Sequence, residues 1–303
     1  MAKDFPQHFW SSDIRSELQR LLAIAVPEDS GENGDITSQA LVPPEASGSA
    51  AVQARQAGVI AGIETIEVIV AAIDKNLIWQ PIIKDGTAVK EGETIGILTG
   101  SAAKLLAAER LVLNFMSKLS GIATLTRQYV DAVAGTKAKI YDTRKTTPGW
   151  RLLEKYAVVC GGGHNHRTGL FDSVLIKDNH LAFVKSCGEN YTPADAVRKA
   201  KEYVKAQGLA DALIEIEVDT LEQLRLVLPE EPDIVLLDNM KTEQISAAIR
   251  IRDAVSPAVE LEASGGVNLK TVRSIAETGI GRISVGALTH SAAALDLGLD
   301  WGS

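Results

Sequence analysis

The second half of the chain contains a regular series of short apolar strands, and this feature constrains the fold most. Strand-like runs cover residues 138–142, 173–177, 213–217, 233–238, 259–264 and 282–286. The last four end at Glu217, Asp238, Ser264 and Gly286, at intervals of 21, 26 and 22 residues. One strand plus one helix needs about this length in a parallel sheet or barrel. The sequence therefore predicts an α/β architecture of parallel strands joined by helices.

Helical patterns occupy the intervals between these strands, which supports the same architecture. They lie at residues 220–228, 242–255 and 269–277. Thr220, Thr242 and Asn268 precede or begin these segments, and their side chains suit the N-cap position. Each interval thus contains a helix with a plausible start signal.

The first half of the chain has a different pattern. Residues 13–26 have helical spacing, and residues 49–100 alternate short strands, one helix and turn dipeptides, as in a compact α+β module. A helix follows at 101–133, where Ser120–Gly121 is expected to break it. We place the boundary there, with an N-terminal domain at 1–120, joined by 291–303, and a barrel domain at 121–290.

Composition excludes several classes of protein. The 303 residues are 46% hydrophobic and 23% charged, so the chain can bury a large core. Its net charge of −8 argues against a nucleic-acid partner. Cys160 and Cys187 are too few for a disulfide scaffold and are expected to be free thiols. No run suits a signal peptide or a membrane span, which predicts a cytoplasmic protein without a membrane partner.

Polar or glycine residues end five of the predicted strands. They are Lys177, Glu217, Asp238, Ser264 and Gly286. In a barrel the carboxyl ends of the strands share one face, and the active site lies there. Polar residues can also simply mark where a strand stops. Lysine, glutamate and aspartate at successive strand ends favour a common pocket over that alternative.

Residues 139–185 are basic within an acidic chain. This window holds eight Lys or Arg residues against four acids, together with His164, His166 and His180. A solvated basic face is the alternative. However, Arg144–Lys145 and His166–Arg167 lie beside glycines and strand ends. Because arginine binds a carboxylate or phosphate through two parallel hydrogen bonds, the pattern indicates a ligand with several negative charges.

Two glycine-containing loops near the end of the chain predict a phosphate site. Ser264–Gly265–Gly266 and Val285–Gly286–Ala287 follow the last two strands. Barrels often bind phosphate in these two loops, through backbone N–H groups. The chain has no GxGxxG motif and no P-loop, so nothing points to NAD or ATP.

The motifs together resemble the carboxylating nicotinate-nucleotide pyrophosphorylases, which are quinolinate phosphoribosyltransferases. The resemblance rests on residues 108–114, 120–124, 142–149, 161–167, 176–180, 215–219, 236–240, 262–266 and 283–291. It implies an incomplete parallel α/β barrel with an N-terminal α+β hammerhead-like domain. It also implies a pentosyltransferase of NAD biosynthesis that makes nicotinate mononucleotide, pyrophosphate and CO₂ from quinolinate and phosphoribosyl pyrophosphate. Mg²⁺ and a homodimer with shared active sites are implied as well, and no organic cofactor.

The resemblance also implies which residues form the site. The quinolinate side would use Arg110, Arg144, His166, Arg167 and Lys177, with Arg110 serving the neighbouring subunit. The phosphoribosyl side would use Lys145, Glu217, Asp238, Ser264, Gly265, Gly266, Val285, Gly286, Ala287 and His290. Thr143 would also bind substrate. Lys145, Glu217 and Asp238 would be catalytic, and Glu217 and Asp238 would also hold Mg²⁺.

Two alternatives remain at this point. One is a related phosphoribosyltransferase-like protein of metal-transport operons with another acceptor; the presence of Arg144, Arg167 and Lys177 favours quinolinate. The other is a biotinyl or lipoyl carrier, suggested by Val89–Glu93. A carrier needs a lysine at a hairpin tip, usually in Met-Lys-Met or Asp-Lys-Ala, and this segment has neither.

Overall fold

The computed structural model describes residues 4–188 and 191–302, which form two compact units. The parallel-sheet unit contains the start of the chain as far as Pro6, together with residues 128–144 and 164–287. The antiparallel-sheet unit contains residues 7–127 and 145–163 and the chain after residue 287. The chain thus passes between the units several times. The domain boundary placed at residue 120 stays a prediction.

Six parallel strands build the parallel-sheet unit. They are β6 (Lys139–Tyr141), β7 (Val174–Ile176), β8 (Ile214–Val218), β9 (Ile234–Asp238), β10 (Glu260–Ser264) and β11 (Arg282–Ser284). Their order in the sheet is β6-β11-β10-β9-β8-β7, and every neighbouring pair is parallel. Because β6 and β7 end the sheet without pairing to each other, the barrel is open. The predicted incomplete barrel is confirmed.

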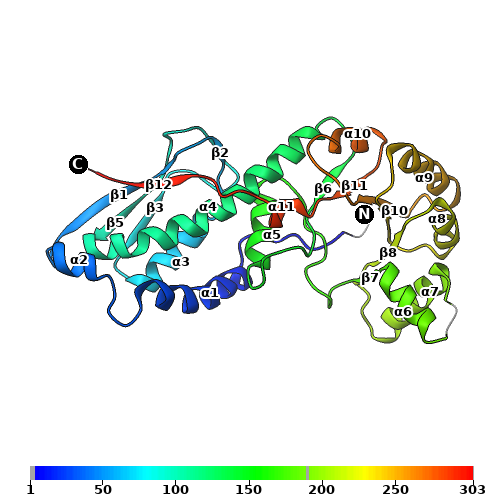
Figure 1. The fold of residues 1–303 in the computed structure, drawn as a ribbon, viewed down its shortest axis with the longest axis horizontal. Helices are drawn as coiled ribbons and strands as arrows, with labels where there is room; N and C mark the ends of the chain where they lie inside the picture. Colours follow the sequence, from blue (N-terminus) through cyan, green and yellow to red (C-terminus); the bar gives the residue numbers. More distant parts are fainter. Residues whose placement is uncertain (1–3, 189–190, 303) are drawn as a thin grey trace. The chain divides into compact units, whose positions relative to one another are not determined.

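Helices connect these strands, as the spacing predicts. They are α6 (Asp178–Ser186), α7 (Pro193–Ala206), α8 (Leu221–Val227) with the 3-10 turn η1 (Leu228–Glu230), α9 (Thr242–Val255) and α10 (Val272–Glu277). Figure 1 shows α8, α9 and α10 on the outer side of the curved sheet.

Only one of the three residues predicted to be N-caps occupies that position in the structure. The Thr220 hydroxyl accepts a hydrogen bond from the backbone N–H of Gln223 at 3.1 Å. Thr242 is instead the first helical residue of α9. Asn268 lies in a turn before α10, and its side chain accepts from the N–H of Lys270 at 2.9 Å.

The open edge beside β6 is extended by the chain that follows α5 (Arg151–Cys160). His164 forms a parallel bridge with Tyr141: its N–H donates to the carbonyl of Ile140 at 2.8 Å, and its carbonyl accepts from the N–H of Asp142 at 2.9 Å. Residues 164–173 then span the gap to β7. The loop that carries the predicted His166–Arg167 pair therefore lies in the seam of the barrel.

The antiparallel-sheet unit is built on a four-stranded sheet in the order β12-β1-β5-β3. Its strands and helices are α1 (Ser12–Ser30), α2 (Ile36–Leu41), β1 (Ser47–Ala54), β2 (Gly58–Val59), α3 (Ile63–Ile73), β3 (Ile78–Pro81), β4 (Ala88–Val89), β5 (Thr94–Ser101), α5 and β12 (Leu297–Trp301). β12 pairs with β1 from residue 297 to residue 301, so the end of the chain adds a strand to a sheet begun near its start.

The helix α4 (Ala102–Ala132) is continuous through Ser120–Gly121, so the predicted break is wrong. Both residues serve packing within the antiparallel-sheet unit. The Ser120 hydroxyl accepts from the N–H of Ala61 at 3.0 Å. A Cβ at Gly121 would lie 2.0 Å from the carbonyl oxygen of Ala293. Glycine is present here because another segment approaches the helix closely, not because the helix ends.

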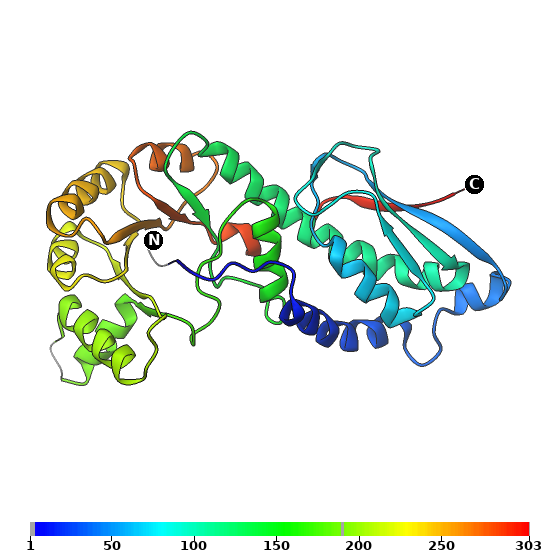
Figure 2. The same cartoon turned by 180° about the vertical axis from the view of Figure 1, so that it is seen from behind.

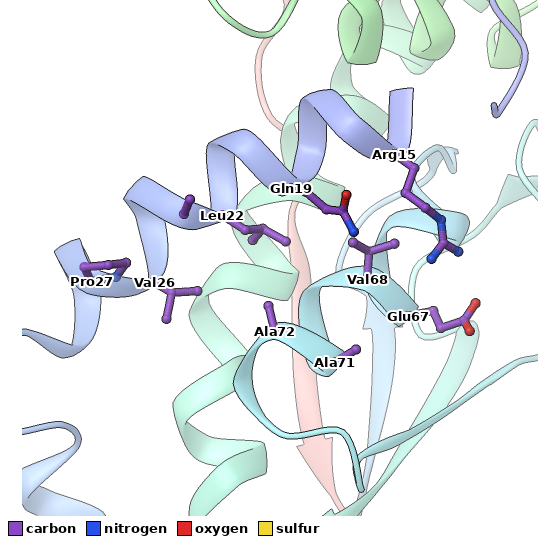
Figure 3. Close-up of a pocket in the computed structure, with 10 residues that line it drawn as sticks. Arg15, Gln19, Leu22, Val26, Pro27, Glu67, Val68, Ala71 and Ala72 are labelled. Carbon is purple, nitrogen blue, oxygen red and sulfur yellow. The ribbon is translucent and has the colours of Figure 1, made fainter. Parts of the chain in front are cut away.

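A surface groove of about 530 Å³ lies between α1 and α3 (Figure 3). Leu22, Val26 and Val68 give it an apolar wall, and Arg15 and Glu67 lie together at one end. None of the predicted site residues lines it. Within residues 4–188 and 191–302, we find no helix with the length and apolarity needed to cross a membrane.

Candidate active site

The carboxyl ends of neighbouring strands carry the predicted polar residues of the parallel-sheet unit. Asp238 and Ser264 end β9 and β10 and are paired in register. Glu217 lies near the end of β8, and Lys177 directly follows β7. All four are partly exposed. The sheet therefore presents two carboxylates, an ammonium and a hydroxyl along one edge.

An ion pair joins Lys177 and Glu217 across two strands. Their Nζ and Oε2 atoms lie 2.6 Å apart, and the side chains are 43% and 11% exposed. The backbone N–H of Lys177 donates to Nδ1 of His180 at 2.9 Å, which fixes the start of α6. His180 is therefore a capping residue, and the lysine ammonium is the exposed partner that an anionic ligand can reach.

Arg167 and Arg144 form the strongest positive feature of the seam. Arg167 is 6% exposed, and its Nη1 donates to the carbonyl of Ser173 at 3.2 Å. Burial, and then the positive charge of Arg144, lower the pKa of the Arg167 guanidinium. The two guanidinium charges repel each other, so an anion near both would be stabilised by both.

His166 lies beneath this pair and is 5% exposed. Its Nδ1 accepts from the backbone N–H of Arg167 at 2.8 Å. Its Nε2 lies 3.0 Å from Oε2 of Glu215 and 3.5 Å from Oε1 of Glu262. Because Nδ1 accepts, the ring proton is assigned to Nε2, which faces the carboxylates. Both ring nitrogens are therefore engaged within the protein.

The loops after β9 and β10 pack against each other at the predicted phosphate site. Gly265 and Gly266 have φ angles of +88° and +61°. A Cβ at Gly265 would lie 2.3 Å from Oδ1 of Asn239. Asn239 itself has a φ of +51°, and its N–H donates to the carbonyl of Ser264 at 2.9 Å. Only glycine suits this backbone, which presents no side chain from positions 265 and 266.

One cluster among the described residues has the geometry of a metal site. His166, Glu215 and Glu262 each offer a ligand atom, all within 4.8 Å of one another. However, Nε of Arg282 lies 3.0 Å from Oε2 of Glu262, so a cation already offsets part of this charge. Mg²⁺ usually takes one or two protein carboxylates plus substrate oxygens, and the partly exposed Glu217 and Asp238 at the strand edge offer carboxylates of this kind.

Comparison with known families decides the identity of this arrangement. Residues 35–120 match the N-terminal domain of quinolinate phosphoribosyl transferase, and residues 122–300 match its C-terminal domain. This chain belongs to the quinolinate phosphoribosyl transferase family. The resemblance found in the sequence motifs is therefore confirmed.

Individual quinolinate phosphoribosyl transferase relatives cover nearly all of the chain. The nicotinate-nucleotide pyrophosphorylase [carboxylating] of Mycobacterium leprae is 44% identical over 91% of this chain and 94% of its own length. A probable enzyme of this name from Bacillus subtilis is 40% identical, over 94% and 93%. The solved nicotinate-nucleotide pyrophosphorylase of Francisella tularensis has a TM-score of 0.88 and 35% identity, covering 99% and 100% of the two chains.

Three residues that the family resemblance assigns to the site belong to the antiparallel-sheet unit. They are Arg110, Lys145 and His290, and all three are exposed. Arg110 shares an exposed face of α4 with Leu106 and Asn114, one turn away on either side. The remaining predicted residues, from Thr143 to Ala287, lie in the parallel-sheet unit. Val285, just after β11, donates its N–H to the carbonyl of Tyr141 at 2.9 Å.

The sequence analysis gave no role to five residues that contact His166 or the groups around it. They are Asp4, Phe5, Glu215, Glu262 and Arg282. A signal existed for Glu215 and Glu262, which precede Glu217 and Ser264 by two residues. Alternate residues of a strand face the same side of the sheet. A charged residue in the middle of a buried strand therefore predicts a polar interior beneath the strand-end residues.

Proposed function

We propose that this chain transfers the phosphoribosyl group of phosphoribosyl pyrophosphate to quinolinate. CO₂ is lost, and the products are nicotinate mononucleotide and pyrophosphate, in the synthesis of NAD. The observation that carries this conclusion is a strand edge that presents an ammonium and two carboxylates, with the buried Arg167 tied to the residue before β7. Family membership gives this arrangement its substrates. None of the relatives named above supports the other acceptor considered for proteins of metal-transport operons.

The basic groups bind the two adjacent carboxylates of quinolinate. Arg167 and Arg144 offer planar forks that match a carboxylate, and Lys177 adds a point charge. Lys177 must leave Glu217 to reach the ligand, and at 43% exposure it is free to turn. Quinolinate thus replaces one ion pair with another and frees the Glu217 carboxylate.

The released Glu217, together with Asp238, supports the transfer step. The quinolinate nitrogen forms a bond to C1′ of the ribose, while the bond from C1′ to pyrophosphate breaks and the leaving group takes the electron pair. The ribose carries positive charge in this transition state, which nearby carboxylates stabilise. Lys145 would offset the charge of the pyrophosphate.

Loss of CO₂ follows without a dedicated base. After transfer the ring nitrogen is positively charged, so it stabilises the electron pair left on the adjacent carbon when the C–CO₂ bond breaks. A proton from water then completes nicotinate mononucleotide. The protein needs only to hold the ring, which the arginine pair does.

The glycine loops would hold the 5′-phosphate of the ribosyl donor. The left-handed backbone of Gly265 and Gly266 lets N–H groups approach an anion without a Cβ. Val285–Gly286–Ala287 would add N–H groups from the loop after β11. Glu217 and Asp238 would hold Mg²⁺, which when bound offsets the charge of pyrophosphate.

We include a homodimer with shared sites in the proposal, in which Arg110 serves the partner's site. The exposed face of α4 around Arg110 supports this assignment. Arg110→Ala and Lys145→Ala homodimers should each be almost inactive, whereas a mixed dimer collects both defects in one site. Co-refolding the two variants should restore about a quarter of wild-type activity, by random pairing into half-active heterodimers. Verified heterodimers without recovery would exclude the shared site.

The decisive test of the proposed function is the release of CO₂ from carboxyl-labelled quinolinate, with and without phosphoribosyl pyrophosphate. Release should require both substrates. Nicotinate lacks one carboxylate and leaves buried cations unpaired, so its turnover should be lower by well over about tenfold. Turnover of nicotinate within tenfold of quinolinate would contradict the assignment of Arg144, Arg167 and Lys177. The cytoplasmic location stays a prediction.

A further inference from the structure

Two residues from the start of the described chain, the exposed Asp4 and the buried Phe5, belong to the parallel-sheet unit. Phe5 is 3% exposed and packs with Leu213 and Ile234. Leu213 precedes β8, and Ile234 is the first residue of β9, so Phe5 covers the amino ends of these strands. In Figure 2 the dark blue beginning of the chain lies beside the strands of this unit. The strand-end residues Glu217, Asp238 and Ser264 lie at the opposite, carboxyl ends.

Phe5 stacks directly on the imidazole of His166. The ring centroids are 4.3 Å apart and the planes differ by 29°. The other restraints on His166 come from its edges, where Nδ1 accepts from Arg167 and Nε2 faces Glu215. One face and both nitrogens of the imidazole are therefore restrained, which leaves the ring little freedom to rotate.

Asp4 anchors the same segment through a chain of charged groups. Its carboxylate accepts from Nη1 of Arg282 and from the hydroxyl of Tyr141, both at 2.8 Å. Nε of Arg282 donates in turn to Glu262 at 3.0 Å, and Glu262 faces His166. The guanidinium carbon of Arg282 also lies 3.8 Å from the centre of the Tyr141 ring. Asp4 is thus connected to His166 through two intervening side chains.

One hydrogen bond connects His166, which these contacts restrain, to the proposed binding group Arg167. His166 accepts the backbone N–H of Arg167, the residue whose guanidinium lies near Arg144. A rotation of the imidazole would release this N–H and with it the backbone that aims Arg167. We infer that Asp4 and Phe5 are a positioning element for the acceptor site, holding His166 so that His166 can hold Arg167. This inference rests on the proposed function for the identity of the ligand.

Phe5→Ala tests the inference by quinolinate binding and steady-state kinetics on the full chain. We expect Kd and KM for quinolinate to rise about tenfold, because a misplaced binding group loses its geometry. KM for phosphoribosyl pyrophosphate should stay within about twofold. Phe5→Leu keeps an apolar side chain but has no aromatic face. Its KM for quinolinate should therefore lie between the values of the wild type and Phe5→Ala. The matched control is Phe9→Ala, since Phe9 is 66% exposed.

A merely structural role would give a different result. Loss of stability alone would lower the melting temperature and the active fraction, but it would leave quinolinate affinity of the folded protein at the wild-type value. Equal changes in KM for both substrates would also overturn the inference. A selective rise in KM for quinolinate, absent in Phe9→Ala, supports it.

The second measurement is nitrogen NMR of histidine-labelled, ligand-free protein, with the His166 signals assigned by their loss in His166→Gln. In the wild type, Nε2 should carry the proton and Nδ1 should be unprotonated, as the hydrogen bond from Arg167 to Nδ1 requires. In Phe5→Ala these two signals should move toward the averaged values of a free imidazole. Identical signals in both proteins would overturn the inference. If the wild type fails to bind quinolinate, the proposed function fails, while the NMR result still decides the positioning role.

Discussion

The two units bury carboxylates in different ways. In the parallel-sheet unit, Glu262 is fully buried and faces the charged group of Arg282 and the imidazole of His166. In the antiparallel-sheet unit, Asp85 accepts from the backbone N–H of Ile63 at 3.0 Å and from the hydroxyl of Tyr156. Burial raises the pKa of both carboxyls. Opposing charge counteracts this for Glu262, whereas Asp85 has only neutral hydrogen-bond donors.

This difference separates a carboxylate that is connected to proposed binding groups from one that is not. The charges around Glu262 connect to Arg167 and thus to the seam where we propose that an anion binds. The cluster around Asp85 ends at Tyr156 and at Cys160, whose thiol pKa is raised by burial and by the nearby carboxylate. A thiol in that state is a poor nucleophile. Cys160 and Cys187 are both free thiols, as predicted.

The largest effect should come from packing in the antiparallel-sheet unit. Gly121→Ala would place a Cβ 2.0 Å from the Ala293 carbonyl, so the helix or the opposing segment must shift. We expect a loss of about 3 kcal/mol in the free energy of unfolding, measured by urea denaturation.

The matched control is Gly281→Ala in the parallel-sheet unit. Its Cβ would meet only Oε2 of Glu260, at 3.2 Å, and that side chain can move. The expected loss is below about 1 kcal/mol. Equal losses at the two glycines would contradict the close packing assigned to α4.

The second-largest effect should be a loss of activity, and it distinguishes a lysine that binds quinolinate from one that does not. Lys177→Met keeps the length of the side chain and removes its charge. We expect kcat/KM for quinolinate to fall about 100-fold, equivalent to about 2.7 kcal/mol, with little change in melting temperature. Lys185→Met, at an exposed position of helix α6, which begins directly after Lys177, should stay within about twofold. Similar losses for both lysines would remove Lys177 from the site.

The smallest effect should be on the pH dependence of the free energy of unfolding, to which Asp4 and Asp85 contribute slopes of opposite sign. Burial raises the pKa of Asp4, but the hydrogen bonds and charge of Arg282 outweigh it and hold the pKa below its ordinary value of 3.8. Its contribution to stability is therefore present above 3.8 and is lost as the pH falls through the folded pKa. For Asp85 the folded pKa lies above 3.8, so the stabilising contribution is present below 3.8 and is lost as the pH rises.

Asp4→Asn and Asp85→Asn test these slopes by urea denaturation between about pH 3 and pH 8. Asp4→Asn should lower the free energy of unfolding by about 1 kcal/mol at pH 7, and the loss should shrink in acid. For Asp85→Asn, the free energy of unfolding should increase relative to that of the wild type as the pH rises. Slopes of the same sign would show that the two clusters do not differ as described.

The sequence predicted the parallel sheet well because its evidence is local. Each strand is a short apolar run, and each is separated from the next by enough chain for a helix, so β8 to β11 begin and end within two residues of expectation. Gly121 misled the analysis because the reason for glycine is the carbonyl of Ala293, far along the chain. Asp4 and Phe5 carry no local pattern at all. Their partners, Arg282 and His166, are defined only by the fold.

The open seam between β6 and β7 affects how substitutions in this enzyme are interpreted. In a closed barrel, backbone pairing between neighbouring strands holds the structure together without help from the ligand-binding side chains. Here the loop that spans the seam is tied by one of those side chains, since Arg167 donates to the carbonyl of Ser173. Replacing Arg167 would remove the proposed ligand contact and a structural tie together, so its measured effect would be a sum of both. The ammonium of Lys177 pairs with Glu217 and holds no backbone carbonyl, so replacing Lys177 leaves the tie across the seam in place.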